Sequence, residues 1–217
     1  MGCCLCHPWC YGSPEVLMST PTLIPAPKPR PGTQSTSPFV RKCLRRIEGA
    51  RPEAALAIDV PSGHGRHSYL LVEHGFDVIA IDADESALRY VCEGAPGGNL
   101  RIMCVVADCL IDIPLATDTI FIAVVVHFIS SALLHTLSRL LRTGGYLVYE
   151  TYGGNGGNYL ALPHPGQIAA ELHPSFELIY YQEKPVGPRK DTVTVKCLAK
   201  RVTAPLDNRP ACTKGKG

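Results

Sequence analysis

Residues 57–67 read AIDVPSGHGRH, and residues 76–82 read FDVIAID. Each stretch is an apolar run that reaches an aspartate, Asp59 or Asp82, and the first continues into a turn with two glycines. The apolar runs have the length of buried strands, and residues 66–74 between them have the apolar spacing of a helix. The pattern therefore predicts a strand–helix–strand unit whose glycine turn faces a nucleotide-like ligand.

Apolar runs and helical patterns continue to alternate along the chain. Strands are predicted at 56–60, 78–81, 102–107, 119–126 and 146–152, and helices at 38–50, 66–74, 85–93, 130–141 and 165–172. The run at 119–126 carries no charge, which is typical of a strand buried on both faces. Two further strands, 176–183 and 192–200, alternate apolar and polar residues and predict an antiparallel pair. The order predicts an α/β fold with a doubly wound, mostly parallel sheet and an antiparallel C-terminal hairpin.

The composition of the 217-residue chain limits its domain organisation and its partners. Residues 1–37 hold seven prolines and predict a disordered Cys/Pro-rich leader, while residues 203–217 predict a disordered basic tail. The remaining residues, 38–202, fit one domain. Residues 51–199 carry ten basic and sixteen acidic side chains, a balance that argues against nucleic acid as a partner. We expect a monomer or homodimer that acts on a small molecule.

Four of the ten cysteines, Cys3, Cys4, Cys6 and Cys10, crowd the first ten residues beside His7. Two interpretations stay open, a zinc or iron–sulfur clip and a disordered leader without metal. A metal site needs ligands that the fold brings together, and the sequence has no second paired Cys/His cluster. The other cysteines are scattered singly, as reduced intracellular cysteines usually are. We therefore predict no metal.

The sequence shows no stretch that is long and apolar enough for a transmembrane helix. The longest apolar run, 120–129, includes His127 and falls far short of the roughly 20 residues that a span needs. The first residues lack the basic and apolar regions of a secretory signal. We expect a cytoplasmic protein with no membrane partner.

The glycine turn separates two classes of nucleotide ligand. Gly63 and Gly65 allow close backbone approach, but the dinucleotide fingerprint needs a third glycine where this chain has Ser68. Asp59 precedes the turn, and a carboxylate there repels a pyrophosphate but suits an ammonium group. S-adenosylmethionine offers an ammonium and no phosphate; alternatively, Asp59 only structures its own turn. Two further residues flank the turn and are expected to line the pocket or face solvent, His64 and His67.

Two more aspartates follow predicted strands. Asp82 is suited to accept both hydroxyls of a ribose in charge-assisted hydrogen bonds. The alternative is a capping box, with Asp82 as the N-cap of the next helix and Glu85 at its third position. Asp108 is suited to accept from the exocyclic amine of adenine, or else is a surface loop residue. Because ligands of open α/β sheets bind outside the carboxyl ends of the strands, we expect the carboxylates to share a cleft.

The ends of the fourth and fifth predicted strands are expected to border the reacting methyl group. His127 is a candidate general base if the acceptor must lose a proton, or else a hydrogen-bonded wall residue. Tyr152 is a second candidate. Residues 153–159 are rich in glycine and predict a substrate-facing loop or a passive linker, with Tyr159 and His164 as candidate lid contacts.

With these residues in view, the chain resembles the class I S-adenosylmethionine-dependent methyltransferases. Within that class it is similar to the small tellurite-resistance-like methyltransferases. The stretches that carry the resemblance are 58–68, 76–82, 140–151 and 193–199. The resemblance implies a Rossmann-like seven-stranded sheet in which strand seven lies antiparallel between strands five and six. One departure is Thr143, which replaces a proline often found before the Gly-Gly turn and is expected to affect only the rigidity of that turn.

The resemblance also implies roles for the residues at the strand ends. Asp59, Gly63 and Gly65 are expected to surround the methionine portion of the cofactor, Asp82 the ribose and Asp108 the adenine. In full, the candidate cofactor contacts are Asp59, Gly63, Gly65, Arg66, Asp82, Ala83, Asp108, Cys109 and Val126, and the candidate catalytic residues are His127 and Tyr152.

These features predict an enzyme that transfers a methyl group from S-adenosylmethionine to a small-molecule acceptor such as a thiol or a chalcogen oxyanion. A soft acceptor that is already deprotonated needs no base, whereas an oxygen or nitrogen acceptor would use His127 or Tyr152. Two alternatives stay open. One is an NAD-dependent oxidoreductase, against which Ser68 and Asp59 argue, and the other is a non-catalytic adenosine-binding module on the same fold.

Overall fold

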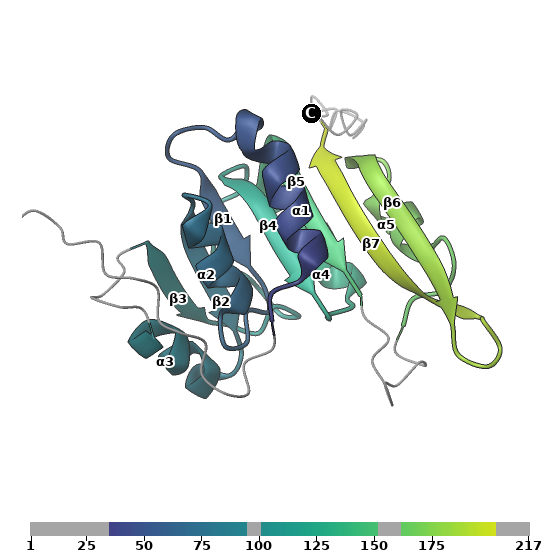
Figure 1. Ribbon diagram of the computed structural model, residues 1–217, viewed down its shortest axis with the longest axis horizontal. Helices are drawn as coiled ribbons and strands as arrows, with labels where there is room; N and C mark the ends of the chain where they lie inside the picture. Colours follow the sequence, from purple (N-terminus) through teal and green to yellow (C-terminus); the bar gives the residue numbers. More distant parts are fainter. Residues whose placement is uncertain (1–34, 95–100, 152–161, 203–217) are drawn as a thin grey trace, which may run out of the picture.

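The computed structural model describes residues 35–94, 101–151 and 162–202, which form a seven-stranded sheet with helices on both faces (Figure 1). The strands are β1 (Leu56–Asp59), β2 (Asp77–Asp82), β3 (Ile102–Val106), β4 (Ile120–Val126), β5 (Leu141–Glu150), β6 (Phe176–Val186) and β7 (Thr192–Arg201). The helices are α1 (Pro38–Ile47), the short 3-10 helix η1 (Glu48–Ala50), α2 (Arg66–Glu73), α3 (Glu85–Gly94), α4 (Ser131–Leu140) and α5 (Gln167–Leu172).

The strand order is β3-β2-β1-β4-β5-β7-β6, and the first five strands of this order run parallel. Strand β7 pairs antiparallel with both β5 and β6. This topology confirms the predicted fold, including the position of strand seven between five and six. The chain moves outward from β1 in one direction and from β4 in the other, so the carboxyl ends of β1 and β4 form the switch point at which such sheets bind ligands.

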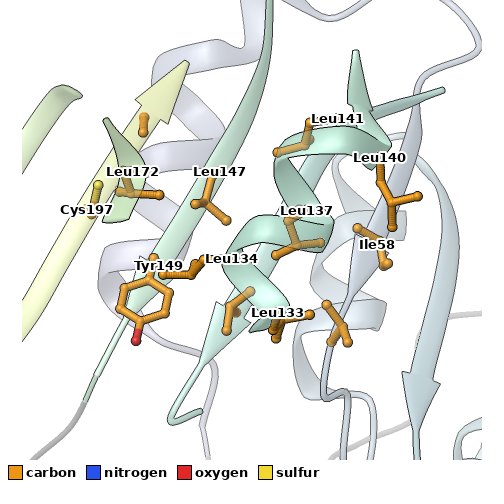
Figure 2. Close-up of a cluster of buried hydrophobic side chains, with 14 of the residues drawn as sticks. Ile58, Leu133, Leu134, Leu137, Leu140, Leu141, Leu147, Tyr149, Leu172 and Cys197 are labelled. Atoms are coloured by element: carbon orange, nitrogen blue, oxygen red, sulfur yellow. The ribbon is translucent and has the colours of Figure 1, made fainter. Parts of the chain in front are cut away.

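Two apolar layers hold the helices against the sheet. On one face, α1 and α2 pack on β1, β4 and β5 through a cluster that includes Val40, Leu44 and Leu71. On the other face, α4 and α5 pack through Leu134, Leu137 and other buried side chains (Figure 2). Strand β4 is buried along its whole length, as predicted for a strand covered on both sides. The rigid centre of the sheet thereby fixes the strand ends that carry the candidate site.

The structure differs from the sequence predictions at the start of the fifth strand. Strand β5 begins directly after α4, at Leu141, rather than at Tyr146, because Leu141 already pairs with Ile120 before the register shifts. Among the described residues, no helix is long and apolar enough to cross a membrane. Several predictions lie outside the described residues: Tyr152, the glycine-rich loop with Tyr159, the cysteine cluster near residue 1, and the disorder predicted for residues 1–34 of the leader and for the tail at 203–217.

Candidate active site

The two glycines of the turn after β1 have different surroundings. Gly63 has φ of +51°, and a Cβ added there would meet nothing within 4 Å. Gly65 has φ of +74°, and a Cβ there would lie 2.7 Å from a methyl group of Val91 on α3. Gly63 therefore leaves open space beside the turn, whereas Gly65 allows α2 and α3 to pack closely.

The turn is fastened to the end of β2 by two hydrogen bonds. The Ser62 N–H donates to the carbonyl of Ile81 at 2.8 Å, and the Gly63 N–H donates to the Asp82 carboxylate at 2.7 Å. The Ser62 hydroxyl is buried, and it has no hydrogen-bond partner among the described residues. A buried hydroxyl of this kind, next to the open space at Gly63, is a free polar group for a ligand.

Asp59 lies beneath the turn rather than at its surface. Its side chain is 2% exposed, and its carboxylate accepts a hydrogen bond from the Ser68 hydroxyl at 2.6 Å. Burial raises the pKa of Asp59 to about 7, although the Ser68 hydrogen bonds act in the opposite direction. Ser68, the residue that breaks the dinucleotide fingerprint, is therefore the partner of the carboxylate at the end of β1.

The capping alternative for Asp82 is wrong. The N-cap of α3 is Asp84, whose carboxylate accepts from the N–H groups of Ser86 at 2.8 Å and Ala87 at 3.3 Å. Asp82 instead joins the end of β2 to the glycine turn, and its second oxygen accepts from the Asp84 N–H at 2.9 Å. The chain offers two aspartates before this helix, and only the second one has the spacing of an N-cap.

Asp108 and its neighbours lie one strand further along the same sheet edge. The Asp108 carboxylate is exposed and accepts from the Leu110 N–H at 2.9 Å, which is a turn-forming contact. Cys109 is half-buried, and burial raises the pKa of its thiol. Ala83 is exposed at the end of β2. The β2–β3 register pairs Asp82 with Val106, so Asp108 follows two residues after the position opposite Asp82, at the same edge of the sheet.

His127 follows the last residue of β4, Val126, and has a left-handed backbone with φ of +65°. Few residues other than glycine adopt this conformation, and such strain concentrates at functional sites. The His127 N–H donates to the carbonyl of Glu150 at the end of β5, at 2.8 Å. Partial burial of the ring, together with the positive charge of Arg66, lowers the pKa of His127. The imidazole is therefore neutral near pH 7, the form that accepts a proton.

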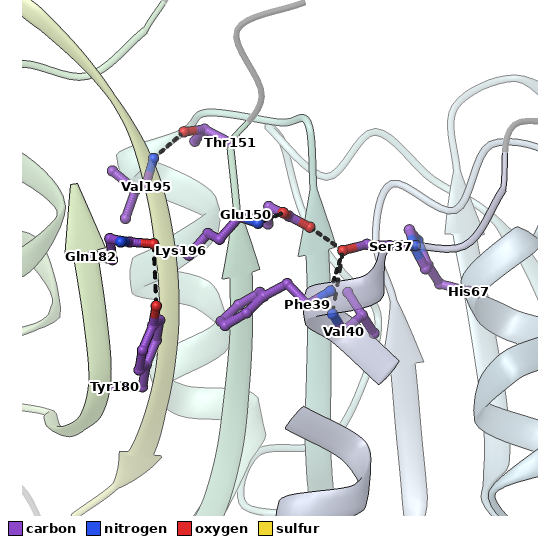
Figure 3. Close-up of polar contacts among 10 residues, drawn as sticks. All are labelled: Ser37, Phe39, Val40, His67, Glu150, Thr151, Tyr180, Gln182, Val195 and Lys196. Atoms are coloured by element: carbon purple, nitrogen blue, oxygen red, sulfur yellow. Dashed lines mark hydrogen bonds and ion pairs between the residues drawn. The ribbon is translucent and has the colours of Figure 1, made fainter. Parts of the chain in front are cut away.

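Sequence reasoning missed a polar network on the β5 side of His127 (Figure 3). The Glu150 carboxylate is buried, lies 3.2 Å from the Lys196 ammonium and accepts from the Ser37 hydroxyl. The Ser37 N–H donates to Nε2 of His67 at 3.1 Å. Burial lowers the pKa of His67 to about 3, and the side chain is 3% exposed, so the expectation of a pocket-lining or solvent-facing His67 is wrong. No local signal reveals these contacts, because they join residues far apart in the chain.

The remaining candidates lie at the edges of this arrangement. The Arg66 guanidinium donates to the carbonyl of Ser35 at 3.2 Å. His64 is exposed and packs edge-on against Tyr90. His164 is exposed and contacts the carbonyl of Asp191 at 2.9 Å, on the C-terminal hairpin. Within the described ranges, no group of three or more His, Cys, Asp or Glu side chains is placed to hold a metal ion.

Comparison with known families decides the class of this site. Residues 58–149 match the family model of the methyltransferase domain. Over these residues the chain is similar to the methyltransferase domain family. The match begins in β1 and ends in β5, and so contains the glycine turn, the strand-end aspartates and His127. It confirms the predicted enzyme class, and the cofactor of the domain is S-adenosylmethionine, as predicted. No curated protein matches the chain.

Solved structures share the fold of the methyltransferase domain at low sequence identity. A methyltransferase from Methanosarcina mazei is 18% identical with a TM-score of 0.57, over 78% of this chain and 99% of that one. A TehB-like methyltransferase from Corynebacterium glutamicum is 22% identical with a TM-score of 0.55, over 73% and 86%. The 1,6-didemethyltoxoflavin-N1-methyltransferase of Burkholderia thailandensis, with bound 1,6-didemethyltoxoflavin and S-adenosylhomocysteine, is 17% identical with a TM-score of 0.56, over 76% and 79%.

The residues at the switch point fit S-adenosylmethionine. The open space at Gly63 accommodates a ligand against the backbone, and the partnerless Ser62 hydroxyl offers it a hydrogen bond. Both Asp82 oxygens accept one backbone N–H each, which leaves further acceptor positions for hydroxyl groups. Helix α2 begins at Arg66, and its N-cap Gly65 has no side chain to cap it, so the first N–H groups of the helix lack that partner. The site thus offers hydroxyl, carboxylate and backbone groups, a combination that suits a phosphate-free nucleoside.

Proposed function

We propose that this chain transfers the methyl group of S-adenosylmethionine to a small soft nucleophile, such as a thiol or a chalcogen oxyanion. The single observation that supports the cofactor half of the proposal is the hydrogen bond from the Gly63 N–H to Asp82. It places the Asp82 carboxylate, which keeps further acceptor positions, beside the open space at Gly63. The tellurite-resistance-like resemblance and the TehB-like structural neighbour favour the choice of acceptor.

The cofactor contacts follow from the order of the strands. Asp82 would accept the ribose hydroxyls, while Asp108 and the backbone of Cys109 would meet the adenine beside Ala83. Gly63 and the first turn of α2, which includes Gly65 and Arg66, would border the methionine portion, with the Asp59 carboxylate beneath it. Val126 would close the site at the end of β4, where it is 9% exposed.

The cofactor supplies an electrophilic methyl group on a sulfonium, so the protein mainly has to align the acceptor and exclude water. His127 stands at the end of β4, next to the switch point, and the end of β5 lies on its other side. A thiolate would arrive without a proton to lose, and His127 would then act as a wall. An amine acceptor would instead pass its proton to the neutral His127 ring. Tyr152 stays a candidate for the same proton.

Titration calorimetry with S-adenosylhomocysteine and, separately, with NAD tests the cofactor half of the proposal. We expect binding of the first and no heat from the second. Binding of NAD alone would favour the oxidoreductase alternative instead.

Methyl transfer is measured from S-adenosylmethionine labelled at the methyl group, with thiophenol, selenite, tellurite and small amines as acceptors. We expect label in the product of thiophenol or of a chalcogen oxyanion. If S-adenosylhomocysteine binds and no member of the panel is methylated, the chain is better described as a non-catalytic adenosine-binding module. Each alternative thus has its own outcome.

A further inference from the structure

The segment Ser35–Ser37 enters the fold across the carboxyl edge of the sheet, and it is called the strap here. It contacts the first turn of α2 on one side, through Arg66 and His67. It contacts the last residue of β5 on the other side, through Glu150. Figure 3 shows Ser37 between His67 and Glu150. Since β4 lies between β1 and β5 in the sheet, the strap passes the end of β4, the strand that His127 follows.

Ser37 uses every hydrogen-bonding position of its side chain. Its hydroxyl accepts from the N–H groups of Phe39 at 3.1 Å and Val40 at 3.3 Å, and so caps α1. The same hydroxyl donates its proton to Glu150. A hydroxyl has one proton and two lone pairs, and all three are in use. The start of α1 is therefore locked to the end of β5 at one defined point.

Glu150 joins two walls of the proposed acceptor site. Its side chain, 5% exposed, holds the strap through Ser37 and pairs with Lys196, whose ammonium also lies 5.6 Å from the Phe39 ring centre. Its main-chain carbonyl accepts the N–H of His127 in its left-handed conformation. The ion pair is half-buried, since the Lys196 side chain is 42% exposed; such a pair contributes little stability but restricts the position of the buried carboxylate.

We propose that Glu150 is a positioning residue for the methyl acceptor: its carboxylate holds the strap as the wall of the acceptor site opposite His127. The inference rests on the proposed function, since it assigns the wall of the same site. Glu150 acts through the strap and takes no proton from the acceptor. Its loss should therefore weaken acceptor binding while the chemical step and the affinity for the cofactor product stay close to normal.

The decisive variant is Glu150→Met, which keeps the approximate size of the side chain and the main-chain carbonyl contact to His127 but removes the oxygen that accepts from Ser37. The matched control is Glu171→Met, because the Glu171 carboxylate accepts from the Ser131 hydroxyl at 2.8 Å and joins α5 to α4 on the opposite face of the sheet. Ser37→Ala removes the hydroxyl, and Ser37→Thr restores it. All variants are made in the full chain.

Hydrogen–deuterium exchange of peptides from 38–47 reports on the strap without any acceptor. We expect exchange at least fivefold faster in Glu150→Met and Ser37→Ala, and wild-type rates in Ser37→Thr and Glu171→Met. The affinity for S-adenosylhomocysteine should stay within twofold of wild type in Glu150→Met. Wild-type exchange in Glu150→Met would overturn the proposal.

Steady-state kinetics with thiophenol test the consequence for the acceptor. We expect KM for thiophenol to rise about fivefold in Glu150→Met with kcat within threefold, and neither value to change in Glu171→Met. Faster exchange with an unchanged KM would show that Glu150 only stabilises the fold, and so would overturn the inference alone. Absence of methyl transfer to any acceptor by the wild-type chain would overturn the proposed function and the inference with it.

Discussion

The two halves of the carboxyl edge are built in different ways. On the β1–β3 half, each aspartate stands at or just past the end of its strand, and its partner lies at most 19 residues away in the chain: the Ser68 hydroxyl donates to Asp59, the Gly63 N–H to Asp82 and the Leu110 N–H to Asp108. On the β4–β5 half, Glu150 contacts Ser37, which is 113 residues away in the chain. The first half repeats a local pattern, and it is the half that we propose binds the cofactor. The second half is assembled by contacts between distant parts of the chain. Its residues can therefore vary with the acceptor, while the first half keeps its pattern.

The largest expected effect separates packing from binding within the β1–β3 half. Gly65→Ala should lower the free energy of unfolding by about 3 kcal/mol, since its methyl group meets Val91 in a left-handed backbone. Gly63→Ala should cost about 1 kcal/mol, because its methyl group enters open space. The same Gly63 variant should weaken S-adenosylhomocysteine binding at least tenfold. Urea unfolding measures the stability losses, and calorimetry measures the affinity for S-adenosylhomocysteine. Equal stability losses in the Gly63 and Gly65 variants would contradict the different roles given to the two glycines.

The next largest effect tests the β4–β5 half through His127. His127→Asn keeps a residue that tolerates the left-handed backbone but removes the base. With a small amine acceptor we expect kcat to fall about a hundredfold, the usual worth of a positioned general base. With thiophenol we expect kcat within threefold of wild type, because the thiolate has no proton to lose. Equal losses with both acceptors would identify His127 as a wall residue.

The same contrast explains what the sequence could and could not predict. Strand ends follow from apolar runs, so Asp59, Asp82 and Asp108 could be placed on neighbouring strands before any coordinates. The choice between Asp82 and Asp84 as helix cap was missed, because both stand before α3 and a shift of two residues decides it. The partners of Glu150 could not be predicted, because no local pattern joins it to Ser37.

A pH effect of moderate size is expected from the β1–β3 half. The pKa of Asp59 is about 7 in the folded chain, above its ordinary value of 3.8, because the carboxyl is buried. The folded chain therefore keeps a proton that the unfolded chain loses, and stability falls as the pH rises from about 4 to 7. Between pH 5 and pH 8, the free energy of unfolding should fall by about 2 kcal/mol more in wild type than in Asp59→Asn. Urea unfolding at both values measures it, and parallel losses in wild type and variant would show that Asp59 is not the group responsible.

The smallest effect separates the two neighbouring aspartates before α3. Asp82→Ala should weaken S-adenosylhomocysteine binding at least tenfold, about 1.4 kcal/mol, because it removes the proposed ribose acceptor and releases the Gly63 N–H. Asp84→Ala removes the N-cap contacts to Ser86 and Ala87 and should lower the unfolding free energy by about 1 kcal/mol. Its affinity for S-adenosylhomocysteine should stay within twofold of wild type.

Both aspartate variants are compared by calorimetry at one temperature, well below the unfolding midpoint of either. Under that condition, lost stability does not appear as lost affinity, so the two roles are read separately. An affinity that falls equally in both variants would mean that the start of α3, rather than the carboxylate at the end of β2, positions the ribose. The β1–β3 half would then depend on helix placement as strongly as the β4–β5 half depends on the strap.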